Sequence, residues 1–401
     1  LEYLRAMSDA GLAVDDAARR IGFALSVSGD FFTQIAKLRA ARELWAKVVT
    51  AAGGDPESAA MHVHARTARF TKSRRDPWVN MLRTTAECTA AVLGGAQSVA
   101  TLPFDEALGT PEELARRVAR NTQVVLREES HLDAVVDPAG GSWFVEALTD
   151  DLARAAWAEL QRVEASGGIV KALGNGLIVD AIGAVSDERR QAIEKRKSPL
   201  VGVSVFPNAD EATVEREQLT EDDVRKMLRV AVDALDVGSH RDQLVGLAQR
   251  ANDPELPMGG LTEACVEAAE DGLDLYSIAA VLQHGQPEFH LEPVRQWRAS
   301  EEWEGLRARS EKSSTRPAAF MANLGPIPAH KARSTWAQNL LSAAGIAAEP
   351  NDGFSDPKSV ADGWSDASAS LAVICGSDAD YETMLEPTVT ALKQAGCPVV
   401  L

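Results

Sequence analysis

Two histidines separated by a single residue, His62 and His64, are the first side chains in the chain that could act together. They lie in the expected strand His62–Thr67, where alternate residues point to the same face. A zinc ion would need a third ligand, and neither a cysteine nor a carboxylate stands at a supporting spacing. Two interpretations remain: a hydrogen bond to an acyl or amide group at the mouth of a barrel, or a packed place within a sheet.

A cluster of basic side chains begins in the same strand. Five basic residues fall within ten positions of a chain whose net charge is −18. Guanidinium groups bind phosphate oxygens in a bidentate fashion, so the cluster suits the phosphates of a nucleotide-like ligand such as coenzyme A. A solvated loop, or a basic contact with an acidic partner subunit, explains it equally well. The members are Arg66, Arg69, Lys72, Arg74 and Arg75.

Polar residues also follow two other expected strands. Asp105 and Glu106 come after Ser98–Leu102, and the active sites of parallel barrels gather at the carboxyl ends of strands. The pair alone is weak support for an acid–base dyad. Gly376-Ser377-Asp378 opens a helix, where anions and cofactor tails bind. The G-x-G-x-x-G fingerprint is absent, so nicotinamide binding is not expected, and Asp378 also suits a helix N-cap.

Composition excludes several classes of protein. With 401 residues, 45 % apolar and 25 % charged, the chain has an ordinary globular composition and the length of two or three domains. Its 59 acidic and 41 basic residues oppose attraction to nucleic acid or to anionic lipid, so neither partner is expected. Four cysteines without C-x-x-C spacing favour a reducing, cytoplasmic location. No membrane span or signal peptide is expected either.

Three regions are predicted from the patterning. Residues 1–148 hold three strand–helix units, with strands at Phe23–Val27, His62–Thr67 and Ser98–Leu102, which predict a parallel sheet of a doubly wound domain or of a barrel. Residues 316–401 predict an open doubly wound domain. Both chain ends have the sequence of interrupted elements, so we expect a piece of a longer chain. In residues 149–315 the predicted helices are Asp151–Ala165, Asp180–Lys195, Thr220–Ala234, Thr262–Gln283 and Val294–Ser310.

Four long stretches resemble the adenosylcobalamin-dependent, coenzyme-A-binding mutases, above all methylmalonyl-CoA mutase. They are FFTQIAKLRAARELWA (Phe31–Ala46), DPWVNMLRTTAECTAAVLGGAQS (Asp76–Ser98), FDEALGTPEELARRVARNTQVVLREES (Phe104–Ser130) and DPAGGSWFVEALTDDLARAAW (Asp137–Trp157).

The resemblance implies an α/β fold in three parts. Residues 1–148 would be the C-terminal part of a (β/α)8 TIM barrel, residues 149–315 a helical linker, and residues 316–401 a truncated, flavodoxin-like domain of the cobalamin-binding type. In this family the barrel threads the coenzyme A chain through its centre, and the C-terminal domain presents a histidine to cobalt. Homolysis of the cobalt–carbon bond then generates the radical that converts (R)-methylmalonyl-CoA to succinyl-CoA.

The resemblance carries site residues over unevenly. Arg20 matches an arginine that contacts the coenzyme A phosphates, although Gly22 stands where a serine is expected. His64 matches a histidine near the acyl-CoA, Gln97 a glutamine beside the thioester, and Glu106 a glutamate near the corrin. These assignments are vestigial, because no catalytic residue is carried over with them.

Two positions depart from the family where the corrin and cobalt would lie. Arg69 stands where a glycine approaches the corrin, and an arginine side chain would take space that the macrocycle needs. In the cobalt-ligand motif D-x-H-x-x-G, Ile327 replaces the aspartate and Ala329 the histidine. His330 is one residue out of register, which turns a side chain by roughly 100° on a helix. No metal ligand is therefore expected in this chain.

Some members of the family pair a catalytic large subunit with a similar small subunit that lacks the ligand motif, and this chain resembles the small subunit. The resemblance implies that adenosylcobalamin is bound by the large subunit, that this chain binds none, and that it binds acyl-CoA at most weakly. Its role would be structural, as the partner of the large subunit. Two alternatives remain: an active mutase that binds cobalamin without a protein ligand, and a regulatory subunit that binds acyl-CoA.

Overall fold

The computed structural model describes residues 1–208, 211–212, 214–218, 220, 222–223, 226, 241–251, 253, 256, 259–283, 291 and 293–401. The chain divides into two compact units, one of Leu1–Arg216 with Val294–Leu401 and one of Glu217–Pro293. The predicted helix Thr220–Ala234 lies almost entirely outside the described residues.

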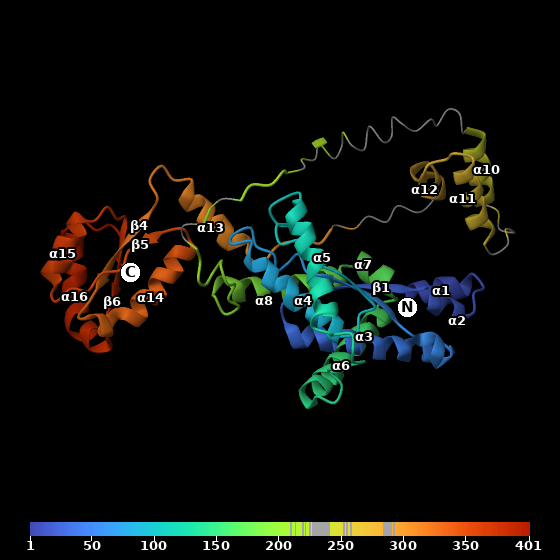
Figure 1. Cartoon of the computed structure of the whole chain (residues 1–401), viewed down its shortest axis with the longest axis horizontal. Helices are drawn as coiled ribbons and strands as arrows, with labels where there is room; N and C mark the ends of the chain where they lie inside the picture. The colour runs from blue at the N-terminus through green and yellow to red at the C-terminus, as the bar shows by residue number, and fades with distance from the viewer. Residues whose placement is uncertain are drawn as a thin grey trace. The chain divides into compact units, whose positions relative to one another are not determined.

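A parallel sheet organises the first part of the larger unit (Figure 1). Its strands β1 (Gly22–Val27), β2 (His62–Thr67) and β3 (Ser98–Ala100) pair in the order β1-β2-β3. The long helices α3 (Phe31–Ala51) and α4 (Val79–Leu93) follow β1 and β2, as crossover connections of parallel strands require. The predicted parallel arrangement is confirmed, although β3 ends two residues before Leu102.

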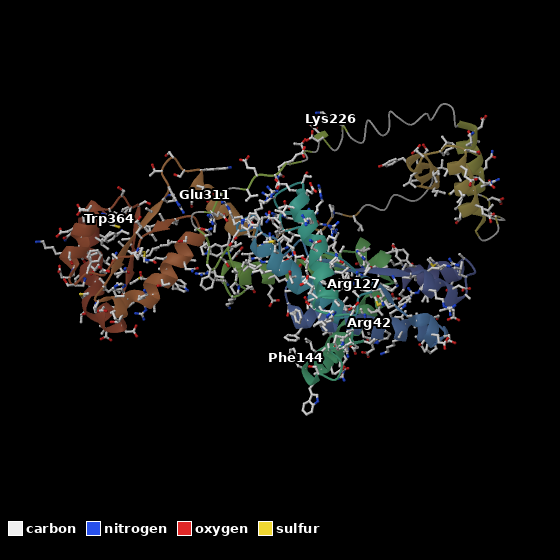
Figure 2. The ribbon with its side chains drawn as sticks, viewed as in Figure 1. Arg42, Arg127, Phe144, Lys226, Glu311 and Trp364 are labelled. Atoms are coloured by element: carbon white, nitrogen blue, oxygen red, sulfur yellow. The ribbon has the colours of Figure 1, made fainter. Side chains whose placement is uncertain are left out.

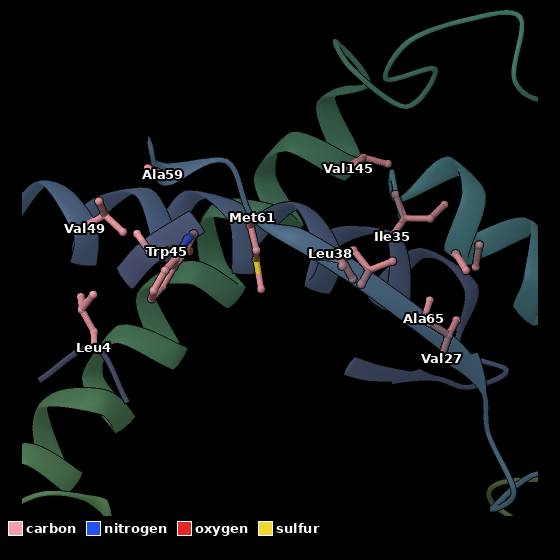
Figure 3. Close-up of a cluster of buried hydrophobic side chains, with 14 of the residues drawn as sticks. Leu4, Val27, Ile35, Leu38, Trp45, Val49, Ala59, Met61, Ala65 and Val145 are labelled. Carbon is pink, nitrogen blue, oxygen red and sulfur yellow. The ribbon is translucent and has the colours of Figure 1, made fainter. Parts of the chain in front are cut away.

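One face of this sheet carries the main hydrophobic core (Figure 3). In β2 the side chains of Val63 and Ala65 are buried while their neighbours in sequence are exposed, as the two-residue period of a strand dictates. Ile35 and Leu38 of α3 pack on the same cluster, and so does Val145 of α6 (Trp143–Ala165). The strand pattern thus separates an apolar face from a polar one.

Further helices surround this core. The helix α6 begins eight residues before the predicted Asp151, directly after the Gly140-Gly141-Ser142 break. Arg39 of α3 lies 2.7 Å from Glu146 on the first turn of α6, and it also pairs with Asp137. These ion pairs fix α6 along α3. The others are α1 (Glu2–Asp9), α2 (Val14–Arg20), the 3-10 helix η1 (Pro56–Ala59), α5 (Glu113–Glu128), α7 (Ile169–Gly174) and α8 (Leu177–Glu194).

The helix predicted over Val294–Ser310 begins instead at Glu301, as α13 (Glu301–Glu311). The residues before it form neither helix nor strand, and they contact the loop that follows β2. The amide of Ala299 donates to the carbonyl of Phe70 at 2.9 Å, and the indole of Trp297 meets the ring of Phe70 edge to face. This tertiary contact overrides the local helical pattern.

A second parallel sheet forms the C-terminal part of the larger unit. Its strands β4 (Ala318–Asn323), β5 (Ala347–Ala348) and β6 (Leu371–Cys375) pair in the order β5-β4-β6. Figure 1 shows α14 (Ile327–Ala343) on one face, and α15 (Pro357–Asp366) and α16 (Asp378–Gln394) on the other. The result is a three-layer α/β arrangement.

Each face of this sheet has its own core. Leu341 of α14 packs with Met321 on one side, whereas Val360 of α15 and Leu392 of α16 pack with Ile374 on the other. Trp364, labelled in Figure 2, closes the second core and donates from its indole nitrogen to the carbonyl of Ala395 at 3.2 Å.

Among its described residues, the smaller unit contains the helices α10 (Arg241–Ala251), α11 (Gly260–Glu270) and α12 (Leu275–Gln283). The single helix predicted over Thr262–Gln283 is wrong, because the backbone turns at Gly272, whose φ is +97°. Leu247, Ala268 and Ile278 form part of its buried core. Within the described residues, no helix has the length and apolarity that crossing a membrane requires.

A fully buried ion pair holds the loop after β2. The Nζ atom of Lys72 lies 2.6 Å from Oε2 of Glu87 on α4, and neither side chain is exposed to solvent. Burial lowers the pKa of Lys72 and raises the pKa of Glu87, and each charge opposes the effect of burial on the other. Thr71 and the amide of Ala68 also donate to this carboxylate.

Replacing Lys72 with methionine should lower the free energy of unfolding by about 3–5 kcal/mol, because Glu87 would be left as a buried charge without a partner. The double variant Lys72→Met/Glu87→Gln should recover most of the loss. Urea denaturation measures both. The matched control is Arg154→Met, which removes an exposed pair with Asp150 and should cost less than about 1 kcal/mol. A double variant no more stable than the single one would contradict this account.

Candidate functional site

Polar side chains occupy the face of the first sheet opposite the core. His62, His64 and Arg66 alternate with the buried residues of β2 and are exposed. In the strand register His64 stands between Ala24 and Ser98, and its Nδ1 lies 2.8 Å from the Ser98 hydroxyl oxygen. Within the described residues no group of three histidine, cysteine, aspartate or glutamate side chains could hold a metal ion.

Two of the residues singled out by sequence lie at the amino edge of this sheet. Arg20 ends α2 and is exposed, two residues before β1. Gln97 precedes β3. Its side-chain oxygen accepts from the backbone amide of Val63 at 2.7 Å, and its backbone amide donates to the carbonyl of Val63 at 3.0 Å. These two hydrogen bonds join the start of β3 to β2.

At the carboxyl edge, Asp105 and Glu106 do not act as a dyad. Asp105 is buried and accepts from Nε of Arg216 at 2.6 Å. Glu106 lies 3.3 Å from Nε of Arg69. The two carboxylates therefore bind different arginines. From Arg20 through His64 to Glu106, the predicted residues run from the amino edge to the carboxyl edge of the sheet.

The basic cluster does not converge on one point. Lys72 is buried against Glu87, and Arg75 pairs with Glu211 and with Glu311, the end of α13 labelled in Figure 2. These two cations therefore serve the structure.

Arg69 and Arg74 line a cavity of about 360 Å³ at the carboxyl edge, and Lys72 contributes to the same wall. The opposite wall comes from the segment before α13, including Gln296 and Trp297. Arg298 anchors this segment by pairing with Glu304, with 2.6 Å between Nη2 and Oε2.

The carboxyl ends of the second sheet also converge on loops that could hold a ligand. The chain turns at Gly325, with φ of +74°, before α14 begins. At the end of β6 the N-cap of α16 is Ser377, which forms a capping box with Asp380, so the expected N-cap role of Asp378 is wrong. Asp378 instead pairs with Arg333 of α14, whose guanidinium also donates to the carbonyl of Gly376. These bonds tie the two loops together.

His330 lies inside this group of loops. Its side chain is buried, and within the described part of the chain neither ring nitrogen has a hydrogen-bond partner. The imidazole approaches the loop after β5 so closely that a Cβ on Gly353 would lie 2.8 Å from Nε2. Ala329, the residue before it, is half-buried.

Several known proteins are similar to this chain over nearly its whole length. A family model described as methylmalonyl-CoA mutase matches residues 1–288. The methylmalonyl-CoA mutase small subunit of Streptomyces virginiae is 39 % identical over 400 residues, covering 99 % of this chain and 54 % of that protein. The probable small subunit of Mycobacterium bovis is 37 % identical over 404 residues, covering 98 % and 53 %. The methylmalonyl-CoA mutase of Escherichia coli is 30 % identical over 422 residues, covering 99 % and 58 %.

The chain belongs to the methylmalonyl-CoA mutase family. It spans about half the length of the curated relatives it matches. Proteins of the methylmalonyl-CoA mutase family depend on adenosylcobalamin, which makes the loops around Gly325 the place to test for a cobalt ligand.

The residues of these loops do not fit that role. In the match that the resemblance implies, Ala329 takes the position of the ligand histidine and offers only a methyl group, and Ile327 offers no carboxylate that could orient an imidazole. His330 is turned into the domain, against Gly353. In the loop after β2, Arg69 carries a long, exposed side chain at a position where the resemblance implies a glycine.

Sequence reasoning missed two interactions that shape this region. Lys72 and Glu87 are fifteen residues apart, and Arg298 attaches a segment more than 200 residues away from the loop after β2. No local pattern marks either, because a buried lysine has the same neighbours in sequence as a solvated one. Arg66, Arg69 and Arg74 of the basic cluster are exposed and Arg75 is half-buried, and nothing in their spacing marks Lys72 as the fully buried member.

A second prediction concerns Glu304. Burial alone would raise the pKa of this carboxyl, but hydrogen bonds and charge from Arg298, with the amide of Arg74, bring the pKa below its ordinary value. A carboxyl with a lowered folded-state pKa stabilises the protein above its unfolded pKa of 4.5, and this stability is lost as the pH falls through the folded value. Glu304→Gln should cost about 1–3 kcal/mol at pH near 7 and lose less stability on acidification.

Urea denaturation between neutral and acidic pH measures the difference. The control is Glu302→Gln, because Glu302 is half-exposed and lies 3.9 Å from its partner Arg190. Parallel acid profiles for Glu304→Gln and the unaltered chain would show that this contact does not respond to pH.

Proposed function

We propose that the chain acts as the small subunit of a heterodimeric, adenosylcobalamin-dependent methylmalonyl-CoA mutase, as the structural partner of a catalytic large subunit. The observation that carries the proposal is Ala329 at the ligand position, with His330 buried beside it. The names of the relatives from Streptomyces virginiae and Mycobacterium bovis support the assignment. In this proposal adenosylcobalamin is bound by the large subunit, and the pair interconverts (R)-methylmalonyl-CoA and succinyl-CoA.

The fold assigned with this function has three parts. We infer that residues 1–148 are the C-terminal part of a TIM barrel, residues 149–315 a helical linker, and residues 316–401 a flavodoxin-like domain. Three parallel strands with helices on one face and polar residues on the other support the barrel. The order β5-β4-β6 supports the flavodoxin-like domain, because its first strand lies between the second and third.

Within this proposal the substrate residues are vestigial. Arg20, His64 and Gln97 would follow the coenzyme A chain across the open face, and Glu106 would lie toward the corrin. The side-chain oxygen of Gln97 already accepts a hydrogen bond from the amide of Val63, and Glu106 pairs with Arg69. Acyl-CoA binding would accordingly be weak at most.

An exposed aromatic patch supports a protein partner. Trp143 is 92 % exposed, Phe144 60 % and Phe32 50 %, and the rings of Phe32 and Phe144 meet edge to face with centroids 5.5 Å apart. Phe144, labelled in Figure 2, and Trp143 form the first turn of α6. Large aromatic side chains are the commonest anchors of protein interfaces, and they are costly to leave in water.

Co-expression with a family chain that carries an intact D-x-H-x-x-G motif should yield a stable one-to-one complex with mutase activity. The purified chain alone should retain no corrin absorbance after gel filtration with adenosylcobalamin, and should show no turnover. A bound corrin with turnover would instead identify an active mutase without a protein ligand. Saturable calorimetric binding of methylmalonyl-CoA by the chain alone would favour the regulatory alternative.

Trp143→Ala should weaken the complex by roughly tenfold or more, since aromatic anchors in interfaces contribute about 2 kcal/mol or more. The dissociation constant is measured by titrating labelled large subunit. The control is Tyr3→Ala on α1, a 75 % exposed aromatic outside the patch. Equal affinities for both variants would place the interface elsewhere.

A further inference from the structure

The cavity at the carboxyl edge of the first sheet has features of an anion site. We propose that it binds a phosphate group, free or as a small phosphate monoester, between the guanidinium groups of Arg69 and Arg74. This inference goes beyond the proposed function and does not depend on it.

The walls of the cavity are held in place by contacts on both sides. Arg298 donates to the carbonyl of Lys72 at 3.3 Å and pairs with Glu304, while Glu304 accepts from the amide of Arg74 at 2.6 Å. The amide of Ala299 donates to Phe70 at 2.9 Å. The loop after β2 and the segment before α13 are therefore joined by several hydrogen bonds, and the arginines project from a fixed backbone.

The two arginines have donors to spare. Arg74 uses Nε on the carbonyl of Ala107 at 2.9 Å, and among the described residues its two terminal nitrogens have no partner. Arg69 is 62 % exposed and uses its Nε on Glu106 at 3.3 Å, and within the described part of the chain its two terminal nitrogens have no hydrogen-bond partner. A guanidinium presents its terminal nitrogens as a planar fork that matches phosphate oxygens. Two such forks on one cavity suit a doubly charged oxyanion.

Two carboxylates, those of Glu106 and Glu301, also line the cavity and reduce its positive charge. Glu301 lies 3.1 Å from Arg295, which offsets its charge. Glu106 lies 3.3 Å from Nε of Arg69 and opposes a bound anion directly. The structure therefore predicts opposite effects for neighbouring side chains: removing Arg69 or Arg74 weakens binding, and neutralising Glu106 strengthens it.

The cavity volume of about 360 Å³ leaves room beside a phosphate for a small organic group. The chain's net charge of −18 does not forbid such a site. Charges farther away than the Debye length, about 8 Å at physiological ionic strength, are largely screened, so the adjacent guanidinium groups dominate. Affinity should fall as salt rises, because Arg69 is exposed.

Isothermal titration of the complete chain with inorganic phosphate, and separately with adenosine monophosphate, tests the proposal. Saturable binding is expected, weakened about ten- to hundredfold by Arg69→Gln and by Arg74→Gln, since charge-assisted hydrogen bonds of about 1.5–3 kcal/mol are lost. Glu106→Gln should tighten binding several-fold. Tighter binding of the nucleotide would assign a monoester, and equal binding would assign free phosphate.

Arg66→Gln is the matched control, because Arg66 belongs to the same basic cluster but projects from the open face of β2 and does not line this cavity. It should leave the affinity unchanged. Urea midpoints verify that each variant is folded. The proposal is overturned if neither ligand saturates the chain, if Arg66→Gln weakens binding as much as Arg69→Gln, or if malonate binds as tightly as phosphate.

Discussion

The buried contact between Lys72 and Glu87 is the constraint on which the larger unit depends. It fixes the loop after β2 against α4, where neither charge can reach water. That loop then offers the backbone of residues 70–74 to the segment before α13. A buried ion pair of this kind contributes little net stability over an apolar pair, but it strongly disfavours any arrangement in which one charge is left alone. Its effect is to specify one geometry for the loop.

Much of the fold follows from the spacing of apolar residues and from the turn-forming residues between them. The strands His62–Thr67 and Leu371–Cys375 were predictable because apolar residues alternate or run together between turn signals. The start of α13 was not predictable, because Trp297 and Ala299 contact Phe70, far away in the sequence. The break between α11 and α12 at Gly272 is a local effect, since a glycine within a helical pattern can end the helix.

The candidate site was less predictable than the fold. The resemblance named His64 and Gln97, but no pattern in the sequence predicted the hydrogen bond between the Gln97 side chain and Val63. Asp105 and Glu106 are adjacent in sequence yet bind different arginines, because neighbouring residues leave a turn in different directions. The residues of the basic cluster likewise have different partners: Lys72 pairs with Glu87, and Arg75 with Glu211. Charge spacing predicts that ionic contacts will form, whereas the partners depend on how distant segments pack.

The edge strand β5 has a consequence for how the C-terminal sheet behaves in a crowded solution. It contributes only two residues, Ala347 and Ala348, beside β4. An exposed edge recruits strands from other molecules when it presents a long row of free amide and carbonyl groups, and two residues present very few. This side of the sheet is therefore a poor template for intermolecular β-pairing. Shortness here acts as protection against aggregation, and lengthening β5 would remove it.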